Sequence, residues 1–339
     1  MYSDSDLDAA VEAGVLKRAD AAAFRAFVAR GQGTAAVDEE QFRLLTGFND
    51  IFVSIASILL LAAINWLGGS FGGPAIAGGL VAVVSWGLAE YFTRQRRMAL
   101  PSIVLLLGFA YGMFLLGEGL FSRATNVTVL TASLPLATGA GLTAAGAYAH
   151  WRRFMVPITV AAGTAAALGM LLMLIAGLVP ALTNHWAPLL LLGGLVVFAF
   201  AMWWDAGDRT RTTRRSDVAF WLHLSAAPMI VHPLFKMLGL LGQGDDDVTR
   251  AAAAIAIYLV LAVVALAVDR RALLVSALFY VVYAMAALFK AAGTLSASFA
   301  LTGLVIGAAL LLLSALWHRV RAAVLALFPA ALRAHLPVV

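Results

Sequence analysis

Ten apolar runs of about twenty residues, joined by short loops, constrain this chain more than any other feature of its sequence. A helix of that length crosses the hydrocarbon core of a bilayer. Charged residues make up only 12% of the chain, against about 25% in a soluble domain. The sequence therefore predicts an all-α, polytopic integral membrane protein. The ten predicted spans are 49–68, 73–93, 99–120, 127–148, 155–178, 187–204, 217–240, 250–268, 272–292 and 297–317.

The arginines in the short loops predict the orientation of these spans. The loops on one side, with the segment after the last span, hold 13 arginines, whereas the loops on the other side hold only Arg123 and Arg250. Cytoplasmic loops of membrane proteins carry such an excess of basic residues. We therefore expect both termini in the cytoplasm. The same bias accounts for the net charge of +5, so we expect no nucleic-acid partner and take the lipid bilayer as the main one.

Several kinds of chemistry have no support in the sequence. The chain has no cysteine, which excludes disulfides, thiolate metal sites and cysteine nucleophiles. Its six histidines are scattered, without the spacing that zinc sites use. It also has no phosphate-binding loop of the Gly-Lys-Ser/Thr type. We accordingly predict no catalytic residue, no metal and no cofactor, and an enzyme is the third choice of function.

Residues 1–36 predict a cytoplasmic helical hairpin followed by a hinge. Ser5 and Asp6 are of the residue types that cap a helix, and Gly14 can end that helix in the left-handed conformation. A second, alanine-rich helix is predicted from about Lys17 to Arg30. A hairpin of this size is too small to fold well alone, so we expect it to dock on the membrane bundle or on a protein partner.

The rest of the chain divides into three predicted parts. Residues 37–48 form an interfacial helix, 49–318 the transmembrane bundle and 319–339 an amphipathic tail helix. The tail helix is expected to lie on the cytoplasmic membrane face, with Arg321 and Arg333 on its polar side.

The N-terminal pattern resembles a known family. A short acidic helix containing Glu-Ala-Gly-Val-Leu precedes an alanine-rich helix, a linker and a first span that ends Ala-Ala-Ile-Asn65-Trp66. Over residues 5–70 this pattern is similar to the bacterial predicted-membrane-protein family known as domain of unknown function 2157. The resemblance implies a multi-pass protein of the bacterial inner membrane and supplies no activity. Its signature residues correspond to Asn65, which we expect to hydrogen-bond between helices, and Trp66, an interfacial anchor.

The seventh run is the least lipid-like of the ten. It holds His223 and, further along, Pro228, His232, Pro233 and Lys236. Ionisable side chains at membrane depth are costly and indicate a functional site by default. Prolines inside a span also free backbone carbonyls, which then need partners in protein or water. We therefore predict a broken span with its pathway residues in the outer half.

Two layers of ionisable residues accompany this span. Glu118 in the third span and Lys290 in the ninth are expected near Lys236, where Glu118 and a lysine would form an outer gate pair. The competing interpretation is that both simply lie near span ends. Asp50, Glu90 and His223 form the predicted inner layer. For that layer the alternatives are an ion pair of Glu90 with Arg94 and a packing role for His223.

These observations predict a transporter or permease for a small solute or ion, possibly coupled to protons. The alternative is a non-transporting membrane scaffold, sensor or assembly subunit that binds a protein partner through its N-terminal hairpin. One further segment, Asp205-Ala-Gly-Asp208-Arg209, could bind a partner or phosphate, but its arginines are typical of an ordinary cytoplasmic loop.

Overall fold

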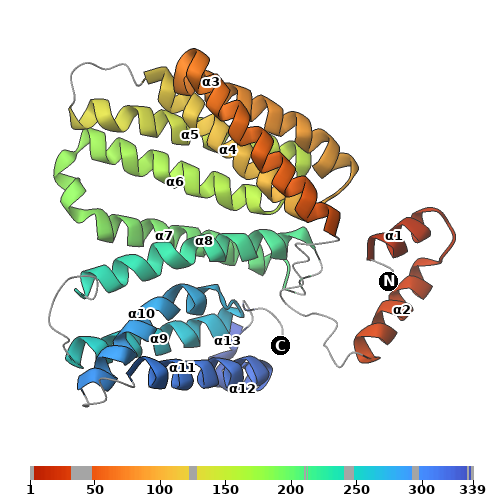
Figure 1. The fold of residues 1–339 in the computed structure, drawn as a ribbon. Helices are drawn as coiled ribbons and strands as arrows, with labels where there is room; N and C mark the ends of the chain where they lie inside the picture. Colours follow the sequence, from red (N-terminus) through yellow and green to blue (C-terminus); the bar gives the residue numbers. More distant parts are fainter. Residues whose placement is uncertain are drawn as a thin grey trace. The chain divides into compact units, whose positions relative to one another are not determined.

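The computed structural model describes residues 4–31, 48–121, 128–209, 211, 213–239, 248–291, 298–333 and 336. Every regular element among these residues is a helix (Figure 1), which confirms the all-α prediction for the described part of the chain. The chain forms two compact units. One is Met1–Phe42 with Thr210–Thr212, and the other is Arg43–Arg209 with Thr213–Val339.

The N-terminal unit contains the predicted helical hairpin. Its helices are α1 (Asp4–Glu12) and α2 (Arg18–Gly31), and Gly14 between them has the expected positive φ of 72°. An ion pair of 2.9 Å between Asp8 and Arg25 joins the two helices. Because α1 begins at Asp4, Ser5 lies in its first turn and does not precede the helix, contrary to our prediction. The hinge and nearly all of the interfacial helix predicted at 37–48 lie outside the described residues.

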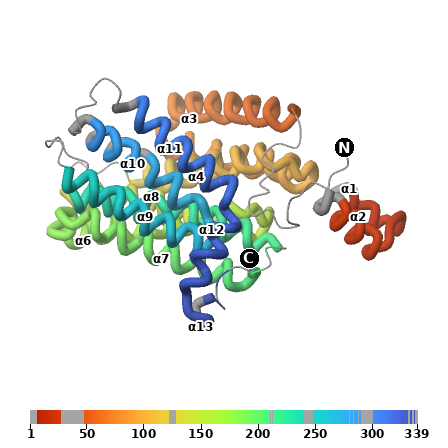
Figure 2. Tube along the Cα trace, turned by 90° about the horizontal axis from the view of Figure 1, so that it is seen from below, coloured from red at the N-terminus to blue at the C-terminus, as the bar shows by residue number. Residues whose placement is uncertain are grey.

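The second unit holds all the long apolar helices (Figure 2). It comprises α3 (Phe48–Ala89), the π-helix η1 (Glu90–Gln95), α4 (Ala99–Phe121), α5 (Val129–Phe154), α6 (Ile158–Leu178), the 3-10 helix η2 (Pro180–His185), α7 (Trp186–Ala206), α8 (Arg214–Met237), α9 (Val248–Val268), α10 (Ala272–Ala291), α11 (Ser298–Ala315), α12 (Trp317–Ala326) and α13 (Ala330–Arg333).

Helix α3 consists of two halves that fold back on each other at Gly73. That residue has φ 77° and ψ −172°, a conformation that glycine adopts without steric cost, and Pro74 begins the second half as it commonly does in helices. The halves then pack closely, because a Cβ on Gly68 would lie 2.8 Å from the Cα of Ala77. Leu61 and Val81, one from each half, share a core cluster.

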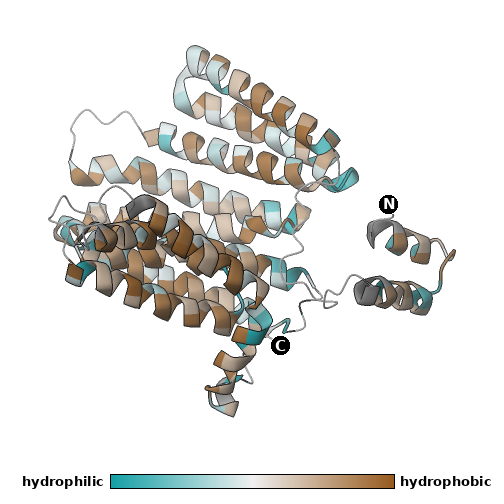
Figure 3. Cartoon of the chain, turned by 60° about the horizontal axis from the view of Figure 1, so that its bottom comes forward, coloured by the Kyte–Doolittle hydropathy of each residue, from teal (hydrophilic) through white to brown (hydrophobic). Residues whose placement is uncertain are grey.

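Seven helices in the described residues are long and apolar enough to cross a membrane, and α11 with α12 makes an eighth if that pair, bent by 78°, is one span. Both halves of α3 and η1 count here as one stretch of 48 residues. Apolar residues predominate along these helices in Figure 3. They are the helices of a multi-pass membrane protein, whereas the count of ten and the cytoplasmic location of both termini stay predictions.

Helix α8 lies at the centre of the packing. Along the bundle α3 packs on α4, α4 on α5, α5 on α6 and α6 on α8, while α8 also packs on α7 and α10. Beyond it, α10 contacts α9 and α11, and α12 contacts α9. With 56% of its apolar window buried, α8 is the most buried of the candidate spans. The seventh predicted run is therefore the helix on which the two halves of the bundle meet.

Two predictions are wrong, one about the shape of a helix and one about the exposure of a side chain. The seventh span is not broken, because α8 is one helix with Pro228 and Pro233 inside it. Each proline removes a single backbone hydrogen bond, and the packing of buried neighbours such as Val231 and Phe235 holds the helix together. Arg321 is also not on an exposed polar face of the tail, since it is 0% exposed.

Candidate functional site

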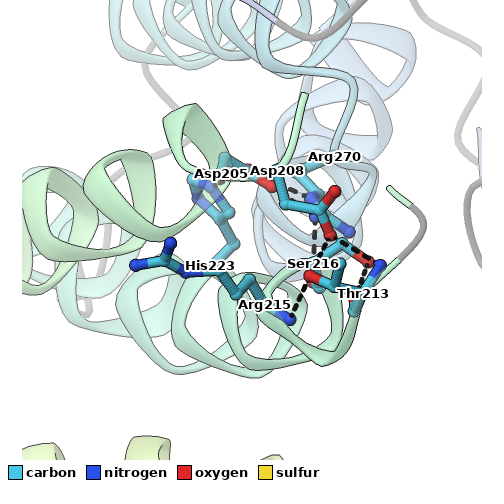
Figure 4. Close-up of polar contacts among 7 residues, drawn as sticks. All are labelled: Asp205, Asp208, Thr213, Arg215, Ser216, His223 and Arg270. Atoms are coloured by element: carbon cyan, nitrogen blue, oxygen red, sulfur yellow. Dashed lines mark hydrogen bonds and ion pairs between the residues drawn. The ribbon is translucent and has the colours of Figure 1, made fainter. Parts of the chain in front are cut away.

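A network of buried ionisable side chains joins α7, α8 and the turn between α9 and α10 (Figure 4). Asp205, in the last turn of α7, is only 2% exposed. Its Oδ2 lies 2.9 Å from Nε2 of His223 on α8. Its Oδ1 accepts a hydrogen bond of 2.6 Å from Nη2 of Arg270. The same Nη2 donates to the backbone carbonyl of Ser216 at 3.1 Å, so Arg270 holds both ends of the α7–α8 connection.

Local capping builds the α7–α8 connection. Asp208 Oδ2 accepts from the backbone N–H of Thr213 at 2.9 Å and from its hydroxyl at 2.6 Å. Thr213 is in turn the N-cap of α8, where its hydroxyl oxygen accepts from the N–H of Arg215. Threonine is a favoured N-cap residue because it satisfies a free N–H of the first turn. These contacts start α8 at a defined residue and place His223 opposite Asp205.

The turn after α9 points two successive side chains in different directions. Asp269 has a φ of 63°, and the N–H of Arg270 donates to the carbonyl of Ala265 at 2.9 Å. This arrangement is the Schellman ending of a helix, with Asp269 at the left-handed position that glycine usually fills. Arg270 then reaches α7 and α8, whereas Asp269 faces the helix that follows α11.

A second buried network surrounds Asp269. Its Oδ1 accepts from Nε1 of Trp317 at 2.7 Å and forms an ion pair with Nε of Arg321 at 3.5 Å. That same Nε donates to the carbonyl of Leu266 at 3.2 Å. Asp269, Trp317 and Arg321 are all buried. These contacts explain the correction for the tail, since α12 docks on α9 through its arginine and does not present that arginine to water.

The charges of the two networks balance when His223 is neutral. Asp205 is matched by Arg270, and Asp269 by Arg321. An ionised carboxylate only accepts hydrogen bonds, so Nε2 of His223 must donate to Asp205. Histidine is the side chain that changes charge most readily near neutral pH. Binding one more proton at His223 would place a positive charge against Phe198, whose ring lies 5.0 Å from the imidazole.

The structure gathers only one of the three predicted inner residues into this network. Asp50 is buried at the start of α3, where its backbone carbonyl accepts from the hydroxyl of Ser54. Glu90 in η1 accepts from Arg153 at 2.6 and 3.0 Å and from Arg94 at 3.3 Å. The predicted Glu90–Arg94 pair is thus present, and Arg153 is the closer partner. A relay through Asp50, Glu90 and His223 gains no support.

The predicted outer residues lie on different helices. His232 and Lys236 are exposed on one face of α8, and Nδ1 of His232 is 2.8 Å from the hydroxyl of Tyr280 on α10. Glu118 is on α4, which packs on α3 and α5, so the helix order does not bring it beside α8. The side chain of Lys290 lies outside the described part of α10. The predicted gate pair therefore has no support, although His232 does contact α10.

The family-signature residues have contrasting surroundings. Trp66 is 77% exposed, as an interfacial anchor would be. The side-chain oxygen of Asn65 is buried without a hydrogen-bond partner in the described residues, so the expected bond between helices is not seen there. The same described part of the chain contains no group of three or more metal-ligating side chains.

Asp205, Asp269, Arg270 and Arg321 are the residues that the sequence analysis missed. All four lie at or just beyond span ends. We interpreted Asp205 as part of a basic cytoplasmic loop and Arg321 as a residue on the polar side of the tail helix, and we gave Asp269 no role. The available signal was an acidic residue directly after an apolar run, as in Val268-Asp269-Arg270. A carboxylate at that depth needs a partner. The adjacent arginine could then have been predicted to pair with a different carboxylate.

Comparisons with known proteins add no relative, since no family model, curated protein or solved structure matches the chain. The resemblance to the domain of unknown function 2157 family accordingly stays a prediction.

Proposed function

We propose that the protein is a permease for a small solute or ion, coupled to protons through the Asp205–His223–Arg270 network. The observation that supports this function is the burial of three ionisable side chains on the most buried candidate span and its neighbours. Buried ion pairs contribute little net stability, because desolvation offsets their attraction. Ionisable groups at membrane depth are therefore more typical of pathways and proton relays.

The proposed coupling step is the protonation of His223. A proton on Nδ1 adds a positive charge to the network. The charged imidazole then competes for Asp205, which weakens the ion pair between Asp205 and Arg270. Because Arg270 also ties the carbonyl of Ser216, its release would free α8 to shift against α10. The exposed face of α8 that carries His232 and Lys236, with Pro228 and Pro233 on the same helix, would form the outer part of the pathway.

The membrane arrangement is part of the proposal. Each of the ten predicted runs overlaps a helix or one half of α3, which supports about ten spans. The arginine-rich loops support cytoplasmic termini. The resemblance of residues 5–70 to a bacterial family supports the bacterial inner membrane.

Single cysteines test the coupling without knowledge of the substrate, because the natural chain has none. Ala227 is buried on α8 in the cluster shared with α9 and α10. In membrane vesicles of the Ala227→Cys variant, a permease should admit a membrane-impermeant thiol reagent from one side. The ratio of this labelling rate to that of an exposed reference cysteine cancels the ionisation of the thiol itself. This ratio should differ about tenfold between pH 6 and pH 8, since this range changes the charge of a histidine.

Two further variants make this experiment decisive. His223→Gln in the Ala227→Cys background should remove the pH dependence of this ratio. The reference cysteine is Val15→Cys, which is exposed between α1 and α2 and lies outside the apolar helices. If Ala227→Cys stays unreactive from both sides at both pH values while Val15→Cys reacts, the bundle is sealed and the permease proposal fails.

The N-terminal hairpin favours a second candidate, a membrane subunit that holds a protein partner. Phe24 and Phe27 on α2 and Val15 before it are exposed, so the hairpin presents apolar side chains that a partner could cover. A stoichiometric partner should co-purify with the wild-type protein and be lost in Phe24→Glu/Phe27→Glu. An exposed charge on the same hairpin gives the control, since Glu12→Gln should retain the partner.

A further inference from the structure

A cavity of about 140 Å³ lies between α10 and the junction of α11 with α12. Leucines and Val275 line most of it, and its polar lining comes from Arg271, Ser314 and Trp317. Val275 is 66% exposed and Ser314 is also exposed. The cavity therefore opens sideways onto the apolar surface of the bundle, where lipid would lie.

The guanidinium of Arg271 lies at one end of this cavity and has no ion-pair partner among the described residues. Its Cζ lies 4.7 Å from the centre of the Trp317 ring, and the side chain is half-buried. No carboxylate in the described residues forms an ion pair with Arg271. The neighbouring Asp269 is directed to Trp317 Nε1 and to Arg321. In the described part of the chain, Arg271 is thus a positive charge held against an aromatic ring and outside any ion pair.

The depth of Arg271 matches that of a lipid headgroup. The residue directly precedes α10 and lies three positions after the end of the apolar helix α9, so it lies where the apolar segments end. The rest of the lining, from Leu274 to Leu278 on α10 and from Leu310 on α11, extends away from it into the apolar part of both helices. A cavity with a positive charge at one end and an apolar lining along the rest matches the shape and polarity of a single phospholipid.

We propose that this cavity binds one anionic glycerophospholipid, with the phosphate and headgroup at Arg271 and the upper part of one acyl chain between α10 and α11. Basic pockets between transmembrane helices on the cytoplasmic side bind anionic lipids in this way. The N-termini of α10 and α12, which both adjoin the cavity, add a favourable field for a negative group. This site is independent of transport and serves a permease or a scaffold equally.

Native mass spectrometry of the full-length protein in detergent tests the site. The probes are phosphatidylglycerol and phosphatidylcholine with the same acyl chains. We expect one phosphatidylglycerol to be retained in preference to phosphatidylcholine. In Arg271→Gln the apparent affinity for phosphatidylglycerol should fall about tenfold, the size expected for losing a charged hydrogen-bond partner. Arg319→Gln is the matched control, because Arg319 is exposed and does not line the cavity, and it should bind like the wild type.

A second variant keeps the test independent of the arginine. Leu278→Trp fills the apolar part of the cavity and leaves Arg271 in place, and it should also lose the preference for phosphatidylglycerol. Equal retention of the two lipids by the wild type would overturn the proposal. Unchanged phosphatidylglycerol binding in folded Arg271→Gln would also overturn it. If Arg271→Gln does not fold, unchanged binding in Leu278→Trp would overturn it.

Discussion

The ion pairs in the two halves of the bundle are built in opposite ways. In the first half, Glu90 accepts from Arg153 and Arg94 at the surface. In the second half, Asp205 with Arg270 and Asp269 with Arg321 are buried. Exposed pairs contribute little because water and salt screen them, whereas a buried pair that loses one partner leaves an uncompensated charge. The second half is therefore the part in which charge and helix position depend on each other.

The largest expected effect is that of Arg270→Ala. It leaves Asp205 buried beside His223 alone, and removing one partner of a buried pair costs about 3–5 kcal/mol. Thermal unfolding of the detergent-solubilised protein measures the loss. The double variant Asp205→Leu/Arg270→Met, which removes both charges, should recover most of it. If Arg270→Ala were no more damaging than Arg153→Ala, the distinction between the two clusters would be wrong.

A smaller effect is expected for Trp317→Phe. The substitution keeps most of the ring but deletes the Nε1–H that donates to Asp269. Leaving a buried charged acceptor short of one donor costs about 1–3 kcal/mol. The same unfolding measurement applies, with Trp66→Phe, an exposed tryptophan, as the control. An unchanged stability in both variants would mean that Arg321 alone suffices for Asp269.

The smallest effect is expected for Glu90→Gln. This carboxylate lies at the surface, so its two arginine partners regain water when it is neutralised. The melting temperature should stay within the error of the wild type, and added salt should not change that result. A clear destabilisation at low salt would place the Glu90 cluster with the buried ones and remove the contrast between the halves.

Sequence reasoning located the helices better than it located the site. The all-α class and the hairpin with Gly14 follow from apolar periodicity and turn chemistry, which are local signals. The Asp205–Arg270 pair joins residues 65 positions apart, and its burial depends on the order in which helices pack. Arg321 was predicted on an exposed face for the same reason. A helical pattern shows which face is polar, but it does not show that a buried carboxylate of another helix faces that side.

The prediction of a broken seventh span failed for a different reason. Pro228 and Pro233 remove backbone donors, but their neighbours are buried on several sides, and the packing outweighs the lost bonds. The chain reversal lies instead at Gly73, where a positive φ before a proline turns the chain back. Prolines alone are thus a weaker signal for a break than a glycine–proline pair.

The position of Asp269 has a consequence for how the protein is made. Its partner Trp317 is 48 residues further along the chain, and Asp205 similarly precedes Arg270. Synthesis proceeds from the N-terminus, so α7 and α9 leave the ribosome before the residues that neutralise them exist. The nascent chain holds unpaired acids until α12 emerges, and a product truncated before Trp317 retains one. The synthesis of α12 therefore changes the charge of the membrane domain, because only a chain that extends to Arg321 neutralises Asp269.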